Sequence, residues 1–203
     1  MTLTASVEPE WAMATILFAD IRGFTTLAER VSALEAVAYL NAFFDVALPV
    51  IERHGGFVHQ LLGDGVLALF GAPRLLADHP DRALAAGCEM LDVVDAQLGD
   101  RCRIGIGINS GLVLLGTIGS GRHGRLGVVG DPVNVAARVQ DATKTIGEAL
   151  LVTEATRCLL GDDAPALTPV GGLSLKGRAK PVYVHHLTTS GAPRTATDPD
   201  PAR

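Results

Sequence analysis

The strictest pattern in this sequence is the alternation of isoleucine with small or polar residues over residues 101–109. The three isoleucines of this stretch share one face of an extended strand, because successive side chains of a strand point to opposite faces. Residues 112–118 are expected to return as a partner strand, since glycines and polar residues interrupt the uncharged stretch 104–121. The pattern therefore predicts two strands and a turn rather than a membrane span.

Apolar patterns elsewhere predict strands and helices in alternation. Further strands are expected at 13–19, 57–62, 66–70, 125–129, 149–152, 170–175 and 181–187. Helices are expected from the Ser32/Glu35 capping box to Gly55-Gly56, from Asp78 and Pro80 through Leu98, and from Asp131 and Pro132 to about Asp141. Because strands and helices interleave and hairpins recur, the predicted fold class is α+β, with a mixed, mostly antiparallel sheet and packed helices.

The length of 203 residues fits one domain with short tails. We expect a lead over residues 1–11, the domain over 12–187, and a disordered tail over 188–203. The start of the chain has neither the basic nor the apolar segment of a secretory signal, and no transmembrane segment is evident. The sequence thus predicts a cytoplasmic protein without direct membrane insertion.

The charge balance limits the kinds of ligand. With 17 Lys+Arg against 22 Asp+Glu, the net charge of −5 provides no basic surplus for a nucleic-acid or anionic-membrane surface. Any polyanionic ligand must be held locally, by a metal or by a few placed cations. Cys88, Cys102 and Cys158 form no CxxC pair and are expected to be buried structural thiols.

Two acidic residues occupy sharp, glycine-flanked positions at the edges of apolar strands. Asp20 ends the first strand in FADIRGFT, and Asp64 lies in the tight turn between the strands at 57–62 and 66–70. If these strands are neighbours, both carboxylates point into one pocket. Paired carboxylates with substrate phosphates suit Mg²⁺. Taken singly, each residue is better explained as an ordinary turn or strand-end aspartate.

Two further groups are candidates for phosphate and sugar contacts. Gly23 and Thr25 follow Asp20 and offer backbone N–H groups where the chain turns into a helix. Asn134 and Arg138 lie four residues apart on one helix face, where an amide and a guanidinium suit a ribose and a phosphoryl oxygen. Taken alone, each of these features also fits a plain turn or an exposed polar face.

These pieces occur together and in order. The segments FADIRGFT, HGGFVHQLLGDGVLALFG, RIGIGINSG, IGS, VVGDPVNVAARV and LKG resemble the catalytic homology domain of class III nucleotide cyclases, the adenylyl and guanylyl cyclase family. The resemblance covers roughly residues 12–187. It implies a ferredoxin-like core that works as a head-to-tail homodimer with a nucleoside triphosphate, expected to be ATP, at the interface.

The resemblance also implies roles for individual residues. Asp20, Asp64 and the backbone carbonyl of Ile21 would bind two Mg²⁺ or Mn²⁺ ions per active site, with Gly23, Phe24 and Thr25 near the phosphates. The partner subunit would contribute the remaining groups. Asn134 would orient the ribose, Arg138 would meet charge developing at the α-phosphate, and Lys176 would hold the terminal phosphates.

The sequence departs from the family pattern at the positions that read the base. Adenylyl members usually carry a lysine where this chain has Gln60, and an aspartate or threonine where it has Gly127. Glutamine can face adenine or guanine, whereas glycine accepts no hydrogen bond through a side chain. At the usual second phosphate-arginine position the chain has Gly105, with Arg103 two residues earlier on the same strand face.

Three hypotheses follow from this resemblance. The first is an adenylate cyclase that makes cyclic AMP. The second is a guanylyl or base-relaxed cyclase. The third is a weakly active homology domain that binds nucleotide in a regulatory role. Loss of both base readers favours the third, whereas retention of the carboxylate pair, Asn134, Arg138 and Lys176 opposes it.

Overall fold

The computed structural model describes residues 8–120, 123–175 and 178–188. In chain order its elements are β1 (Glu10–Ile21), α1 (Phe24–Ala28), α2 (Ala33–Arg53), β2 (Phe57–Leu62), β3 (Gly65–Phe70), α3 (His79–Leu98), the 3₁₀ turn η1 (Gly99–Arg101), β4 (Ile104–Ile118), β5 (Arg125–Val129), α4 (Asp131–Ile146), β6 (Leu150–Thr153), α5 (Glu154–Arg157), β7 (Leu167–Leu173) and β8 (Val182–Leu187). The expected disordered tail lies outside the described residues, apart from Thr188.

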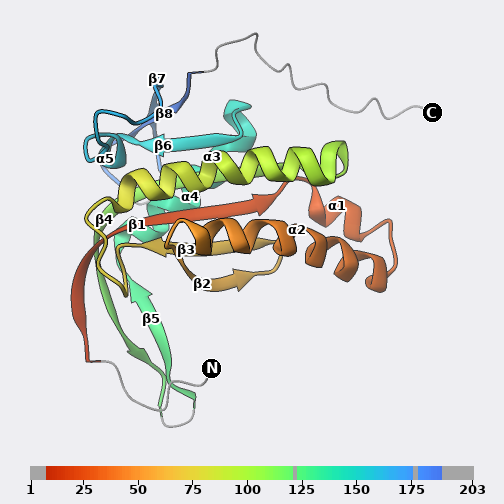
Figure 1. Cartoon of the computed structure of the whole chain (residues 1–203), viewed down its shortest axis with the longest axis horizontal. Helices are drawn as coiled ribbons and strands as arrows, with labels where there is room; N and C mark the ends of the chain where they lie inside the picture. The colour runs from red at the N-terminus through yellow and green to blue at the C-terminus, as the bar shows by residue number, and fades with distance from the viewer. Residues whose placement is uncertain (1–7, 121–122, 176–177, 189–203) are drawn as a thin grey trace.

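The described strands form one sheet in the order β2-β3-β1-β4-β6-β8-β7, and β5 pairs with the far part of β4. All neighbours are antiparallel except β4 and β6, which run parallel. The prediction of an α+β fold with a mixed, mostly antiparallel sheet is therefore confirmed. Figure 1 shows that β4 and β5 extend as a two-stranded ribbon away from the body of the sheet.

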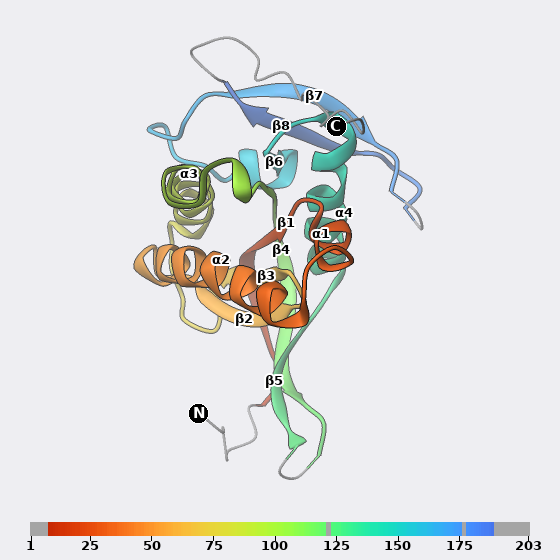
Figure 2. The ribbon, with the colours of Figure 1, turned by 90° about the vertical axis from the view of Figure 1, so that its right-hand side faces the viewer.

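Helices cover both faces of the sheet. Figure 2 shows α2 and α3 on one side of β1 and β4, with α4 on the other. The larger core cluster lies beneath α2 and α3 and includes the isoleucines of β4, which are almost fully buried as their alternation predicts: Ile104, Ile106 and Ile108. The opposite face of β1 and β4 packs against α4, and this is the helix that carries the predicted Asn134 and Arg138.

The predicted break between strands at 109–112 is wrong, because β4 is one continuous strand from Ile104 to Ile118. Strand β1 explains the continuity, since it pairs with β4 without interruption from Glu10–Leu115 to Ile21–Ile104. The polar pair Asn109-Ser110 is buried inside the strand rather than placed in a turn. Residues 114–118 pair with β5, and β1 pairs with the other edge of β4 as far as Leu115.

Helix α2 begins as the sequence predicts. The Ser32 hydroxyl accepts a hydrogen bond from the Glu35 backbone N–H, and the Ser32 N–H donates to the Glu35 carboxylate at 2.8 Å. The helix ends before Gly55, whose φ of +78° is a conformation that glycine adopts at little cost. By length and composition alone α2 could span a bilayer, but its buried face, which includes Phe43 and Ile51, packs in the core.

Glycines of β4 let α4 approach the sheet closely. A Cβ placed on Gly107 would lie 2.3 Å from the Gln140 backbone nitrogen, and one on Gly105 would lie 2.3 Å from the Thr143 hydroxyl oxygen. Either contact is too short for two heavy atoms, so larger residues at these positions would push the helix away. Helix α4 also continues beyond the predicted end near Asp141, to Ile146, because the residue that ends it is Gly147 with φ of +86°.

The cysteines differ in their exposure. Cys102 is buried and Cys88 is half-buried, but Cys158 is exposed at the end of α5. The expectation of three buried thiols is therefore wrong for Cys158, which lies on the outer side of a short helix close to Glu154 and Arg157.

Candidate active site

The sheet brings the two predicted carboxylates to one edge. Asp20 is the next-to-last residue of β1 and faces Gly65 in the register with β3, while Asp64 lies in the tight β2–β3 turn. The Ile21 N–H donates a 3.2 Å hydrogen bond to the Asp64 carbonyl oxygen, which ties this turn to the end of β1. Gly63 adopts φ of +66°, as this sharp turn requires. Two acids 44 positions apart (64 − 20) are thus neighbours.

Gly65 is a site residue that the sequence reading assigned only to the turn. A Cβ at this position would lie 3.0 Å from the Ala19 carbonyl oxygen and 3.1 Å from Oδ1 of Asp20. The missing side chain leaves the Asp20 carboxylate room beside the turn. The Gly-Asp-Gly triplet indicates that Gly65 belongs to a tight turn. Only the pairing of β1 with β3 shows that its missing side chain leaves room for the Asp20 carboxylate.

The electrostatic surroundings of Asp20 are mixed. Its side chain is 22% exposed. Burial raises the pKa of this carboxyl above its usual range, the nearby Asp64 carboxylate raises it further, and Lys144 opposes both effects. The Lys144 ammonium nitrogen donates to Oδ2 of Asp20 at 3.3 Å. The two carboxylates therefore form a site at which positive charge is favoured.

Lys144 was missed by the sequence reading. It lies in the last turn of α4 and also approaches Oδ1 of Asp141, one helical turn earlier, at 4.0 Å. Its contact with Asp20 spans 124 positions. No local sequence pattern predicts such a contact, because it depends on how α4 crosses the end of β1.

The carboxylate pair fits a magnesium or manganese site. Mg²⁺ is usually bound through one or two carboxylates, with waters and substrate phosphates completing its shell. Asp20 and Asp64 supply two carboxylates. Ile21 directly follows Asp20 at the end of β1 and is hydrogen-bonded to the backbone of Asp64. No group of three or more His, Cys, Asp or Glu side chains suited to a metal occurs among the described residues, so substrate oxygens would have to complete the shell.

The predicted phosphate loop follows directly. Gly23 caps α1 with φ of +72°, and a Cβ built on it would have no heavy atom within 4 Å. Phe24 turns its ring toward Tyr39, with ring centroids 6.1 Å apart, and packs against the core. The half-buried Phe24 ring is thus engaged in packing, whereas the Thr25 side chain is exposed.

Asn134 and Arg138 lie on α4, with Asn134 exposed and Arg138 half-buried. The buried face of the helix belongs to other residues, including Val135 and Val139. At 1.5 Å per residue, Asn134 lies about 15 Å along the helix from Lys144, which contacts Asp20. A single chain therefore brings Lys144 to the carboxylates but leaves the short Asn134 side chain well away from them.

The remaining predicted positions are dispersed. Lys176 lies outside the described residues. Gln60 is exposed on β2, beside an irregularity in its pairing with β3. Gly127 is buried in β5, where a Cβ would lie 2.2 Å from Cδ1 of Ile118. Arg103 is exposed and its guanidinium lies 3.5 Å from Asp100, so nothing in the structure singles it out for phosphate binding.

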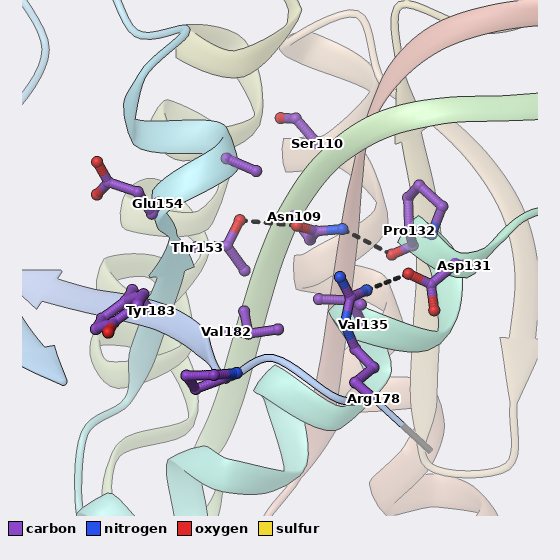
Figure 3. A pocket seen from close by; sticks show the side chains of 12 residues that line it. Asn109, Ser110, Asp131, Pro132, Val135, Thr153, Glu154, Arg178, Val182 and Tyr183 are labelled. Atoms are coloured by element: carbon purple, nitrogen blue, oxygen red, sulfur yellow. Dashed lines mark hydrogen bonds and ion pairs between the residues drawn. The ribbon is translucent and has the colours of Figure 1, made fainter. Parts of the chain in front are cut away.

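A chain of buried hydrogen bonds holds the start of α4. The Asn109 amide donates to the Pro132 carbonyl oxygen at 2.9 Å, and its own oxygen accepts from the Thr153 hydroxyl at 2.8 Å. Figure 3 shows Asn109 between these two partners, at a pocket of about 320 Å³ that is also lined by the Arg178–Asp131 ion pair. The amide thus ties β4 to both β6 and α4.

The same network continues across the sheet. Ser110 donates to the Thr156 hydroxyl oxygen at 3.0 Å and is hydrogen-bonded to Thr15 at 2.6 Å. Thr15 is in turn hydrogen-bonded to Nδ1 of His79 at 2.7 Å. Burial lowers the pKa of His79, against the opposing effect of Asp78 and Asp81. The sequence reading recognised none of these partners, because each is contributed by a different element.

Comparison with known proteins gives one consistent family. The sequence profile described as the adenylate and guanylate cyclase catalytic domain matches residues 7–189. Uncharacterized proteins of Mycobacterium tuberculosis and Mycobacterium bovis are 33% identical to this chain over 168 residues, which is 82% of its length. The match covers 30% of those relatives, so the chain spans under a third of their length.

Solved structures of two specificities resemble the fold. The adenylyl cyclase CyaB from P. aeruginosa has a TM-score of 0.81 and 26% identity, covering 91% of this chain and 98% of its own. The guanylyl cyclase Cya2 has a TM-score of 0.73 and 31% identity, covering 94% and 98%. The catalytic core of a rhodopsin-guanylyl cyclase with converted specificity, solved with ATPαS, has a TM-score of 0.77 and 25% identity, covering 90% and 100%. The similar structures thus include both adenylyl and guanylyl cyclases.

Proposed function

This chain belongs to the adenylate and guanylate cyclase catalytic domain family, and we propose that it acts as an adenylate cyclase that converts ATP to 3′,5′-cyclic AMP and pyrophosphate. The observation that carries the proposal is the approach of Asp20 and Asp64 at the end of β1. Two adjacent carboxylates beside an open glycine turn suit the metal-bound triphosphate that such a reaction needs. The cytoplasmic location and the 12–187 domain boundaries expected from the sequence are part of the same proposal.

In this proposal Asp20, Asp64 and the Ile21 carbonyl hold two Mg²⁺ or Mn²⁺ ions. When bound, such ions lower the pKa of an attacking hydroxyl and neutralise phosphate charge. The exposed backbone at Gly23 and Thr25 lies three to five residues beyond Asp20 and is suited to phosphate oxygens. The side chains of this edge therefore bind and orient the triphosphate, and none of them is required as a covalent nucleophile.

We propose that the remaining groups come from a second copy of the chain. Asn134 would orient the ribose and Arg138 would stabilise charge on the α-phosphate, with Lys176 on the terminal phosphates. The separation of about 15 Å along α4 between Asn134 and the Lys144–Asp20 contact supports this arrangement, because one chain does not bring all these groups together. In the reaction the ribose 3′-hydroxyl attacks the α-phosphorus as pyrophosphate departs, so alignment is the main task of the protein.

Exposed apolar side chains support a homodimer. On β1, β4 and β5 they are Trp11, Met13, Leu112, Ile118 and Val129, and on β2 they are Phe57, Leu61 and Leu62. Apolar surface of this kind, on a projecting ribbon and an edge strand, is typical of a protein–protein interface. We therefore propose a symmetric dimer with two equivalent sites, and we expect isolated monomers to be inactive.

The base preference has a specific alternative. Gly127 provides no side chain, and the Ile118 side chain fills the space where one would project, so only Gln60 remains of the two usual base readers. Selectivity depends on buried groups that the wrong base leaves unpaired. We therefore propose weak preference for ATP over GTP, with a guanylyl or base-relaxed cyclase as the second candidate.

One experiment tests these statements. The purified dimer is incubated with each nucleoside triphosphate in the presence of Mn²⁺. The cyclic product is identified by mass spectrometry, and the released pyrophosphate is quantified. Cyclic AMP as the main product supports the proposal, and cyclic GMP alone would select a guanylyl cyclase. Preference of a thousandfold or more for one base would refute weak selectivity. Nucleotide binding without any cyclic product would refute the cyclase proposal and favour a regulatory homology domain.

A further inference from the structure

The last turn of α4 is joined to the carboxylate edge of the same chain. Lys144 Nζ lies 3.3 Å from Oδ2 of Asp20 and 4.0 Å from Oδ1 of Asp141. The Lys144 side chain is 48% exposed and the Asp20 side chain 22% exposed. The ammonium group thus lies beside the carboxylate pair and is still open to solvent.

Backbone contacts fix the position of this lysine. The Arg22 guanidinium donates to the Thr143 carbonyl oxygen at 3.2 Å and to the Glu148 carbonyl oxygen at 2.6 Å. Arg22 is two residues from Asp20, and Thr143 directly precedes Lys144. Arg22 therefore fastens the end of α4 to the turn after β1, and the Lys144–Asp20 contact follows from this attachment.

We propose that Lys144 is a positioning residue of the metal site, which holds the Asp20 carboxylate and sets the affinity of the site for divalent cations. This inference rests on the proposed metal-binding role of Asp20 and Asp64. Lys144 balances the repulsion between the two carboxylates, but its positive charge also opposes a cation that approaches them. A divalent ion at Asp20 would lie close to the Lys144 ammonium group, so the two positive charges would repel each other.

The size of the effect follows from Coulomb's law. Charges of +2 and +1 about 5 Å apart in water-like surroundings repel enough to weaken binding on the order of tenfold. Removal of the Lys144 charge should therefore tighten metal binding by about this factor. It should also destabilise the protein before metal is added, by roughly 1 to 3 °C in melting temperature, because the carboxylates lose their counter-charge.

These two changes in opposite directions distinguish the proposal from a plain surface ion pair. An ion pair with only a structural role would lower stability when broken and leave metal affinity unchanged. Lys144→Met removes the charge and keeps most of the aliphatic stem, with Lys144→Gln as a second variant should the first aggregate. Lys144→Arg keeps the charge and should restore wild-type metal affinity.

Arg157 offers a matched control. It forms an ion pair with Glu154 on α5, at the end of the sheet opposite to Asp20. Strand β6 runs parallel to Ile106–Ile108 of β4 and leads into α5 beyond Ile108. Asp20 pairs with Gly105, at the other end of this part of β4. Arg157→Met removes one positive charge and one exposed ion pair but should leave metal affinity unchanged.

The experiment uses the full chain and Mn²⁺ alone, without nucleotide. Binding is followed by water-proton relaxation and the melting temperature is recorded with and without Mn²⁺, for wild type, the Lys144 and Arg157 variants, and Asp20→Asn. About tenfold tighter Mn²⁺ binding by Lys144→Met, with lower stability before Mn²⁺ is added, supports the proposal.

Two results would overturn it, and they are distinguishable. If Asp20→Asn weakens Mn²⁺ binding but Lys144→Met binds as wild type does, only the role of Lys144 is refuted. If wild type and Asp20→Asn bind Mn²⁺ equally, the proposed metal site itself fails, and the role of Lys144 fails with it.

Discussion

Replacement of Asn109 by alanine tests how the start of α4 is held. The Asn109 side chain is buried and makes two hydrogen bonds, to the Pro132 carbonyl oxygen and from the Thr153 hydroxyl. Alanine would leave the Pro132 carbonyl oxygen without this donor, at a cost of about 1–3 kcal/mol. The Thr153 hydroxyl keeps a longer contact of 3.3 Å with Thr156, so its loss should be about 1 kcal/mol or less.

The sum is a loss of about 1–4 kcal/mol in the free energy of unfolding. For a chain of this size that lowers the melting temperature by about 2–15 °C. Urea denaturation followed by circular dichroism measures the change. Asn41→Ala, at an exposed position on α2, is the matched control and should stay within about 0.5 kcal/mol of wild type.

A second variant separates the two hydrogen bonds. Asn109→Asp keeps an acceptor for the Thr153 hydroxyl but places a carboxylate against the Pro132 carbonyl oxygen, so it should be at least as destabilising as alanine. Because Pro132 belongs to the first turn of α4, folded Asn109→Ala protein should also lose turnover more than nucleotide affinity. If both Asn109 variants unfold within about 0.5 kcal/mol of wild type, the amide does not hold the helix.

Two further predictions follow from the same elements. Arg138→Ala should lower turnover roughly 100- to 1000-fold, because it removes a donor aimed at charge in the transition state, while nucleotide affinity measured by calorimetry changes little; unchanged turnover would refute this role. The His79 pKa is lowered in the folded protein, so the unfolded state binds a proton more readily than the folded state does. The free energy of unfolding should therefore fall as the pH drops below about 6.5, by at most about 1.4 kcal/mol per pH unit. His79→Gln should reduce this acid sensitivity in urea midpoints taken between pH 7.5 and 5.5, and an identical pH dependence in the two proteins would contradict the reasoning.

The sequence predicts the elements that depend on local chemistry. The Ser32/Glu35 capping box starts α2 and Gly55 follows its end, because these signals act within one helical turn. The end of α4 is not predicted in this way, since the expected end near Asp141 falls short of Ile146. The β2–β3 hairpin is also predicted, since its tight turn needs glycine at φ of +66°. The meeting of Asp20 with Asp64 was conditional on neighbouring strands, and the register of β1 with β3 fulfils that condition.

The sequence does not predict features that depend on long-range pairing. The uninterrupted β4 was missed because Asn109-Ser110 looks like a turn, although its polar groups are satisfied by Thr15, Thr153 and Thr156 on other elements. Lys144 was missed for the same reason, since its partner on β1 is identified only when α4 is packed on the sheet.

The glycines of β4 have a consequence for redesign of the protein. Because a Cβ placed on Gly107 would lie 2.3 Å from the Gln140 backbone nitrogen, the spacing between α4 and the sheet depends on the glycines of β4. Gln60 lies on β2, and the strands β3 and β1 lie between β2 and β4. Libraries that vary Gln60, the proposed base-reading residue, therefore leave this contact between α4 and β4 unchanged, and base selectivity can be screened apart from the packing of the helix.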